Sequence, residues 1–130
     1  MVSFARFELS GTGPIYLQII RHLKRGVVAG TVGDGDEMPS RRVLSAQLGV
    51  NPNTVQKAYR LLEEEGLICS HAGAKSVVVL TPGRVEEIRR QLLAEEALAL
   101  IAAMRQMGVE KEEAISLMET LWDEEGGGEI

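Results

Sequence analysis

The chain has 130 residues, of which 45% are hydrophobic and 25% charged, and can bury the core of one domain with a small appendage. One cysteine excludes an internal disulfide, and we expect neither a signal peptide nor a membrane helix, so the composition predicts a cytoplasmic protein. The net charge of −5 argues against a nucleic-acid partner. However, residues 1–82 hold nine Lys or Arg and seven Asp or Glu, whereas residues 83–130 hold five and twelve. This asymmetry fits a DNA-facing front half.

The first predicted helix begins at Pro14, which is placed at its first position, and Gly30 ends it. Residues 1–13 ahead of it are predicted to form a short extended arm, in which Phe4 and Phe7 cover the core. One apolar stripe repeats along the helix at helical spacing: Ile15, Ile19, Leu23 and Val27.

A pair of short helices with a tight turn is predicted between Pro39 and Gly66. Ser40 is a good N-cap for the first helix, and Gly49 suits the left-handed conformation that follows it. Asn51 caps the second helix, with proline next to it at the first helical position. The apolar positions are Val43, Leu44 and Leu48 in the first helix, and Val55, Ala58, Tyr59 and Leu62 in the second.

The polar face of the second helix is the strongest functional signal in the sequence. Its side chains lie off the apolar stripe, are concentrated toward the N-terminal half, and are Asn53, Thr54, Gln56, Lys57 and Arg60. Asn and Gln can pair with adenine, Thr can touch a thymine methyl group or a phosphate, and the cations neutralise phosphates. The pattern is typical of a DNA-recognition helix, although a solvated polar face on a helical hairpin gives the same periodicity.

Three stretches resemble one family of proteins. Residues 39–68 (PSRRVLSAQLGVNPNTVQKAYRLLEEEGLI) resemble the winged helix-turn-helix of the GntR family of bacterial transcription regulators. Residues 49–59 are most similar to its short YtrA-like branch, and residues 14–19 (PIYLQI) match the family's first helix. The resemblance implies a mainly α fold with a small β-wing, namely an N-terminal winged helix-turn-helix followed by a two-helix dimerisation hairpin.

Two arginines in the first turn of the supporting helix are further DNA-binding candidates. Arg42 matches the arginine of the family's P-S-x-R pattern, and the resemblance implies contact with the DNA backbone or base edges. An ion pair with Asp36 or Glu37 is the alternative for Arg42. Arg41 is less typical of the family, and the sequence leaves its role open between DNA contact and a structural contact.

The wing is predicted from two short apolar segments, Leu67–Cys69 and Ser76–Leu80, with a loop between them. The loop departs from the family because it lacks the usual arginines and carries lysine where a second glycine is common. A cysteine in a short apolar strand is most often a buried small hydrophobe, so Cys69 is predicted to be buried. The DNA-binding candidates of the wing are His71, Gly73 and Lys75, and Asn51 completes the DNA-binding set.

The C-terminal part, residues 82–130, is separated from the winged helix-turn-helix of residues 1–81 by the turn signal Thr81-Pro82-Gly83. Helices are predicted over 84–107 and 111–124, and the last residues are expected to fray. Two helices this apolar must bury against something else, and a symmetric dimer is the economical solution. The predicted dimerisation residues are Leu92, Leu93, Leu100, Ile101, Met104, Ile115, Met118, Leu121 and Trp122. Folding back to give a monomer, or lining an effector pocket, are the alternatives.

The leading functional prediction is a dimeric repressor that reads a pseudo-palindromic operator of double-stranded DNA through the major groove. The alternative is a winged-helix protein-interaction module or antirepressor, which the acidic C-terminal half favours. No enzyme is expected, because the sequence shows no nucleophile motif, phosphate loop or paired acid and base. No cofactor is predicted, and His22 and His71 are too far apart to suggest a metal site, while a small-molecule effector is left open.

Overall fold

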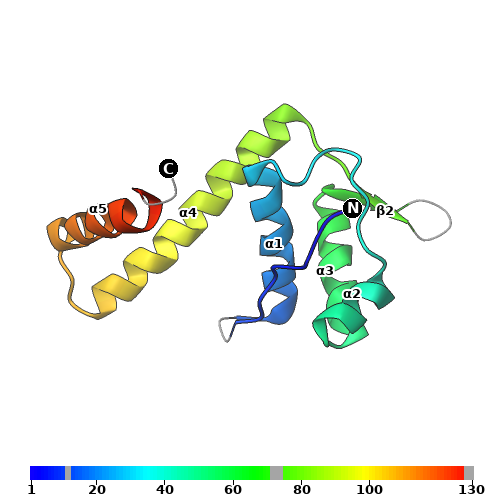
Figure 1. Ribbon diagram of the computed structural model, residues 1–130, viewed down its shortest axis with the longest axis horizontal. Coiled ribbons are helices and arrows are strands. Elements are labelled where there is room, and N and C mark those ends of the chain that lie inside the picture. Colours follow the sequence, from blue (N-terminus) through cyan, green and yellow to red (C-terminus); the bar gives the residue numbers. More distant parts are fainter. Residues whose placement is uncertain (11–12, 71–74, 128–130) are drawn as a thin grey trace. The chain divides into compact units, whose positions relative to one another are not determined.

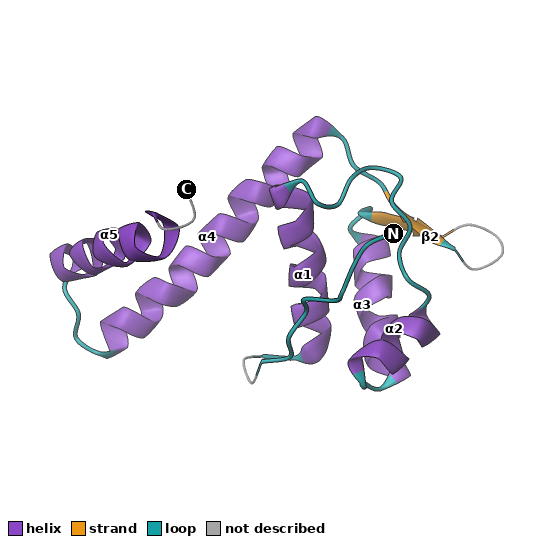
Figure 2. Cartoon of the chain, in the orientation of Figure 1, coloured by secondary structure: helices purple, strands orange, loops and turns teal. Residues whose placement is uncertain are grey.

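The computed structural model describes residues 1–10, 13–70 and 75–127. Helices and short strands follow one another in the order that Figures 1 and 2 show. Their bounds are α1 (Ile15–Ala29), α2 (Arg41–Leu48), α3 (Pro52–Glu64), β1 (Ile68–Ser70), β2 (Ser76–Val78), α4 (Pro82–Gln106) and α5 (Lys111–Gly127). The chain is mainly helical, with a two-strand wing after the helix-turn-helix and two C-terminal helices, as predicted.

The core of the winged helix lies between α1 and α3, which run side by side in Figure 1. Ile19, Leu23 and Val27 of the α1 stripe are buried, and Phe4 of the N-terminal arm covers them. Ile15 was predicted to belong to this stripe but is 36% exposed. Pro14 also differs from its prediction by one position, because its extended backbone makes it the N-cap instead of the first helical residue.

The helix-turn-helix is built from the predicted caps. The Ser40 side chain accepts a hydrogen bond from the backbone N–H of Val43, and Gly49 ends α2 with a φ of 68°. All four apolar residues predicted for the second helix are fully buried, so α3 fixes its opposite face toward solvent. Val43 is a correction: it is 53% exposed, and α2 is anchored instead by Leu44, which is fully buried.

The wing is an antiparallel pair in which Ile68 lies opposite Val78 and Ser70 opposite Ser76. β2 is shorter than predicted and ends at Val78, whereas β1 has the predicted length but begins one residue later than expected, at Ile68. The prediction that Cys69 is buried is wrong, because its side chain is exposed. In a strand this short, alternation turns Ile68 toward the core and its neighbour toward solvent.

Two compact units are present, residues 1–92 and 93–130. The first includes the start of α4, where the Thr81 side chain accepts a hydrogen bond from the N–H of Arg84, and where Ile88 is buried. The Arg84 guanidinium donates to the backbone carbonyl of Glu65, just after α3. The predicted domain limit at residue 81 stays a prediction.

The second unit holds the rest of α4 and α5, joined by a turn in which Gly108 has a φ of 75°. The structure bears out the predicted helix at 111–124 and continues it to Gly127, while residues 128–130 lie outside the described part. Much of the apolar surface of this unit is exposed. None of the helices within the described residues is long and apolar enough to span a lipid bilayer.

Candidate nucleic-acid interface

The polar face of α3 is presented to solvent as predicted. Asn53, Gln56, Lys57 and Arg60 are exposed and Thr54 is half-buried, all on the side opposite the buried stripe. Because that stripe is anchored in the core, the face cannot rotate without exposing Tyr59 and Leu62. The helix therefore presents two amides, a hydroxyl and two cations on a fixed surface.

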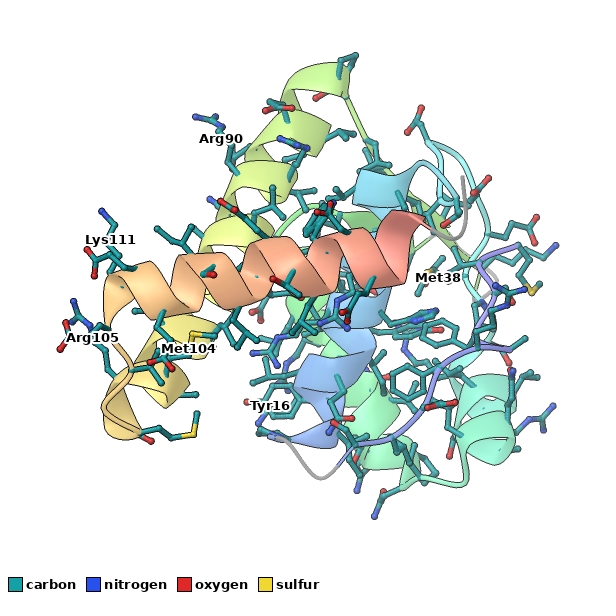
Figure 3. The ribbon with its side chains drawn as sticks, turned by 60° about the vertical axis from the view of Figure 1, so that its left-hand side comes forward. Tyr16, Met38, Arg90, Met104, Arg105 and Lys111 are labelled. Carbon is teal, nitrogen blue, oxygen red and sulfur yellow. The ribbon has the colours of Figure 1, made fainter. Side chains whose placement is uncertain are left out.

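Both cations of this face, Lys57 and Arg60, have neighbours within the protein. The ammonium of Lys57 lies 4.1 Å from the centroid of the Tyr16 ring, in the first turn of α1. Figure 3 labels Tyr16 at that end of α1. Such a cation–π contact on an exposed lysine contributes only about 0.5–1 kcal/mol, so it orients the side chain but can be exchanged for contact with a ligand. Arg60 lies 4.0 Å from Glu64 one turn along, which is a weak exposed pair.

Asn51 has a structural role that overlaps with its predicted DNA contact. Its side-chain oxygen accepts a hydrogen bond of 2.8 Å from the backbone N–H of Asn53, which caps α3. The side-chain NH₂ group remains a donor on an exposed residue. Asn51 thus caps α3 through its side-chain oxygen and keeps a side-chain donor for a ligand.

The two arginines of α2 lie in different environments. Arg42 is exposed and forms no ion pair with any residue in the described ranges. Glu37, one alternative partner for Arg42, lies 3.8 Å from Lys75 instead. The guanidinium of Arg41 contacts Glu63 at 2.9 Å and lies 4.9 Å from the centroid of the Tyr59 ring. Arg42 is therefore the arginine available to a phosphate.

Only one of the wing candidates falls within the described residues. Lys75 is exposed, with its ammonium 3.8 Å from Glu37. His71 and Gly73 lie outside the described part of the chain. At 75% exposure the lysine side chain is free to exchange this weak pair for a phosphate.

Sequence reasoning missed a set of contacts at the base of the wing. The Glu63 carboxylate accepts hydrogen bonds from Arg41 and from the hydroxyl of Ser70, whose oxygen lies 3.0 Å from that of Ser76. We call Arg41, Glu63, Ser70 and Ser76 the wing-base network. Helical periodicity shows only that Glu63 lies one turn after Tyr59, and carries no signal that α2 and β1 meet there.

Tyr59 lies beneath this network and is fully buried. Its hydroxyl donates a 2.5 Å hydrogen bond to the carbonyl oxygen of Pro39, at the entrance to α2. Burial raises the pKa of the Tyr59 phenol well above its usual value, and the nearby Arg41 charge only partly opposes that shift. The phenol therefore stays protonated and remains a donor across the physiological range.

Most of the predicted dimerisation residues are exposed in the single chain. Leu92 is an exception at 6% exposure, and Met104 is half-buried. The others are 41–75% exposed: Leu93, Leu100, Ile101, Ile115, Met118, Leu121 and Trp122. Leu100, Met104 and Ile115 help to line an open groove of about 660 Å³ within the second unit. Figure 3 places Met104, Arg105 and Lys111 beside the turn between the two helices.

A metal site has no candidate among the residues that the structure describes, because no three His, Cys, Asp or Glu side chains gather there. The chemistry on offer is hydrogen bonding and charge on an exposed helix face. Such a face can bind a polyanion with hydrogen-bonding edges, which is the chemistry of a DNA groove.

Comparison with known proteins points to the same chemistry. The family model described as bacterial regulatory proteins, gntR family, matches residues 15–78. The chain is 30% identical over 120 residues to YhcF, an uncharacterized helix-turn-helix regulator of Bacillus subtilis, spanning 92% of this chain and 98% of that protein. It is 39% identical over 85 residues to the Bacillus subtilis repressor YtrA, spanning 61% and 65%. A solved GntR family regulator from Listeria monocytogenes superposes with a TM-score of 0.73 at 30% identity, over 86% and 98% of the two chains.

Proposed function

Because this chain belongs to the GntR family of DNA-binding transcription regulators, which are not enzymes, we propose that it is a dimeric repressor of a pseudo-palindromic operator. The observation that carries this proposal is the polar face of α3, fixed toward solvent by a fully buried stripe. Repression is proposed because the similar YtrA protein is a transcriptional repressor. Because it would act on DNA, we place the protein in the cytoplasm.

The proposed readout uses residues from the N-terminal half of α3, which enters the major groove. Asn53 and Gln56 have amides that match the paired donor and acceptor of adenine, and Thr54 and Lys57 lie beside them. Arg42 and Arg60 contact the phosphates, with Asn51 and Lys75 as further backbone contacts. The few cations predict modest sequence-independent affinity, so most of the discrimination comes from base edges.

Dimerisation is proposed through the second unit. Leucine, isoleucine and methionine side chains on both helices are exposed, and Trp122 is 75% exposed; exposed apolar side chains gathered in this way are typical of a protein–protein interaction site. A symmetric pair would present two recognition helices to half-sites about one helical turn, or a multiple of it, apart. The part of this surface that the partner does not cover is the proposed place for a small-molecule effector. Such an effector would act by changing the angle between the two winged helices.

A second candidate function is a protein-interaction module built on the winged-helix fold. The observation in its favour is charge, because residues 83–130 carry twelve acidic residues against five basic ones. This candidate requires the α3 face to bind protein. It predicts no sequence preference on DNA at any salt concentration.

The test is selection from random duplex DNA with the purified chain, at low and at near-physiological salt. Recovery of an inverted repeat that survives the higher salt supports the dimeric regulator and yields the operator. Recovery of nothing, or of sequence-independent binding that disappears with salt, refutes the proposal that the chain alone reads an operator, and leaves either a regulator that needs its effector or the interaction module.

Variants then localise the contact surface on the recovered operator. Asn53→Ala and Arg42→Ala are each expected to weaken specific binding, by about 1–3 kcal/mol for a base contact, without unfolding the protein. Arg90→Ala is the matched control, since it removes one exposed arginine from α4, outside the helix-turn-helix. Unchanged operator affinity in both test variants would refute the assignment of the recognition helix.

A further inference from the structure

We infer that Glu63 is a positioning residue for DNA binding, which sets the wing relative to the recognition helix through the wing-base network. The inference rests on the proposed function, because it concerns how the DNA-binding surface is held together. Glu63 itself touches no DNA in this assignment. Arg41, which the sequence left open between two roles, becomes its structural partner.

The geometry of the carboxylate carries the argument. A single oxygen of Glu63 accepts both from Arg41, at the start of α2, and from the Ser70 hydroxyl, at the end of β1. Because the Ser70 proton is directed at Glu63, its oxygen is left to accept from the Ser76 hydroxyl of β2, 3.0 Å away. One α3 side chain therefore joins the supporting helix to both strands of the wing.

The backbone closes these contacts into a ring. The N–H of Met38 donates to the carbonyl of Ser76 at 2.9 Å, and Glu37 bridges to Val77, so β2 is paired with the segment that leads into α2. That segment ends at Pro39, whose carbonyl accepts from Tyr59 of α3. The contacts thus run from β2 to the segment before α2, then to α3 and on to β1, and the pairing of β1 with β2 leads back to the first strand.

The burial of the pair indicates a role in geometry more than in stability. The side chains of Arg41 and Glu63 are 28% and 35% exposed, and ion pairs with this exposure add little to folding free energy. However, the Arg41 Nε atom is buried without a hydrogen-bond partner in the described structure. The contacts that do position the guanidinium are those with Glu63 and the Tyr59 ring, and together they restrict where the carboxylate can lie.

The negative charge of Glu63 allows its positioning role to be distinguished from an electrostatic effect on DNA affinity. Removing a carboxylate near a DNA-binding surface should by itself strengthen attraction to phosphates. A loss of affinity on removing Glu63 therefore cannot be electrostatic and must come from position. Glu64 provides the matched control, because Glu64→Ala removes the same charge from the next residue of α3, where the side chain is 63% exposed.

The experiment measures operator affinity by fluorescence anisotropy for Glu63→Ala, Ser70→Ala, the double variant and Glu64→Ala, using the operator selected with the wild type. Amide hydrogen exchange of residues 68–70 and 76–78 is measured on the same free proteins. We expect Glu63→Ala and Ser70→Ala each to weaken binding by about three- to tenfold and to speed exchange in the strands. The double variant should lose no more than either single one, because the two side chains act as one unit.

Several outcomes would overturn the inference. If Glu63→Ala binds the operator as tightly as Glu64→Ala and its strands exchange at the wild-type rate, the backbone pairing alone holds the wing. Additive losses in the double variant would show that Glu63 and Ser70 act separately. If the wild-type chain itself selects no operator, the proposed function fails first and this inference fails with it, whereas intact wild-type binding confines the failure to the inference.

Discussion

Asn51 offers a way to separate folding from DNA contact within one side chain. Its oxygen accepts from the Asn53 N–H at 2.8 Å, and this bond satisfies one of the free donors at the start of the recognition helix. Asn51→Ala removes the bond, and loss of such a cap costs about 1 kcal/mol, within a range of roughly 0.5–2. A domain with about 5–15 kcal/mol of net stability remains folded after that loss, so DNA binding can be measured on the same variant.

Two further substitutions at this position distinguish the two roles of Asn51. Asn51→Ser keeps a capping oxygen and should unfold near the wild-type midpoint, whereas Asn51→Asp keeps the cap and gains from the helix dipole. The DNA-binding ranking differs, because aspartate adds a negative charge opposite the phosphates. We therefore expect Asn51→Asp to be the most stable of the variants and the weakest binder.

The assay is urea unfolding followed by far-UV circular dichroism at one fixed protein concentration, combined with operator anisotropy at one salt concentration. Equal midpoints for Asn51→Ala and Asn51→Ser would refute the capping argument. If the serine variant keeps full stability but loses operator affinity, the side-chain amide contacts DNA directly. Full affinity in the serine variant would assign Asn51 to the cap alone.

Three more predictions follow. Leu44→Ala should lower the unfolding free energy by about 2–5 kcal/mol because Leu44 is fully buried, whereas exposed Val43→Ala should change it by about 0.5 kcal/mol or less in the same urea titration. Above pH 10, the free energy of unfolding should fall as pH rises, because the Tyr59 phenol ionises in the unfolded chain but keeps its proton in the folded one. Tyr59→Phe should lose this pH dependence of the unfolding free energy, whereas Tyr16→Phe should retain it. Leu100→Glu should shift the protein toward monomer in sedimentation velocity, and unchanged sedimentation would contradict the proposed dimer surface.

The caps made the helix-turn-helix predictable from sequence. Ser40, Gly49 and Asn51 act through hydrogen bonds and backbone angles within a few residues, and the structure places each of them as expected. The apolar stripe of α3 was equally clear, because four buried positions at helical spacing leave one orientation for the helix. Local signals of this kind need no knowledge of the tertiary fold.

Residues at the edges of apolar patterns were less predictable. Ile15 and Val43 continue the periodicity of their helices but are exposed, at 36% and 53%. Periodicity gives the direction of a buried face and not its extent, which depends on the neighbouring elements. Cys69 was misjudged for a related reason, since an apolar residue type does not show which face of a three-residue strand it occupies.

The role of Arg41 could not be read from sequence at all. Its partner Glu63 is 22 residues away, and the contact exists only because α2 packs across α3. The second unit shows the same limit in another form, because exposed residues such as Leu100 and Trp122 indicate that something covers them without identifying it. Contacts between distant segments, and contacts with another chain, depend on how whole elements pack, and short sequence patterns do not show that packing.

The exposure of Cys69 has a practical consequence. It is the one cysteine of this sequence, and it lies on β1 beside Ser70, opposite Val77. A thiol-reactive fluorophore would therefore attach at one defined position, next to the contacts that join the wing to α3, with no engineered cysteine. The natural chain thus carries its own labelling site for following the wing in real time as DNA is added.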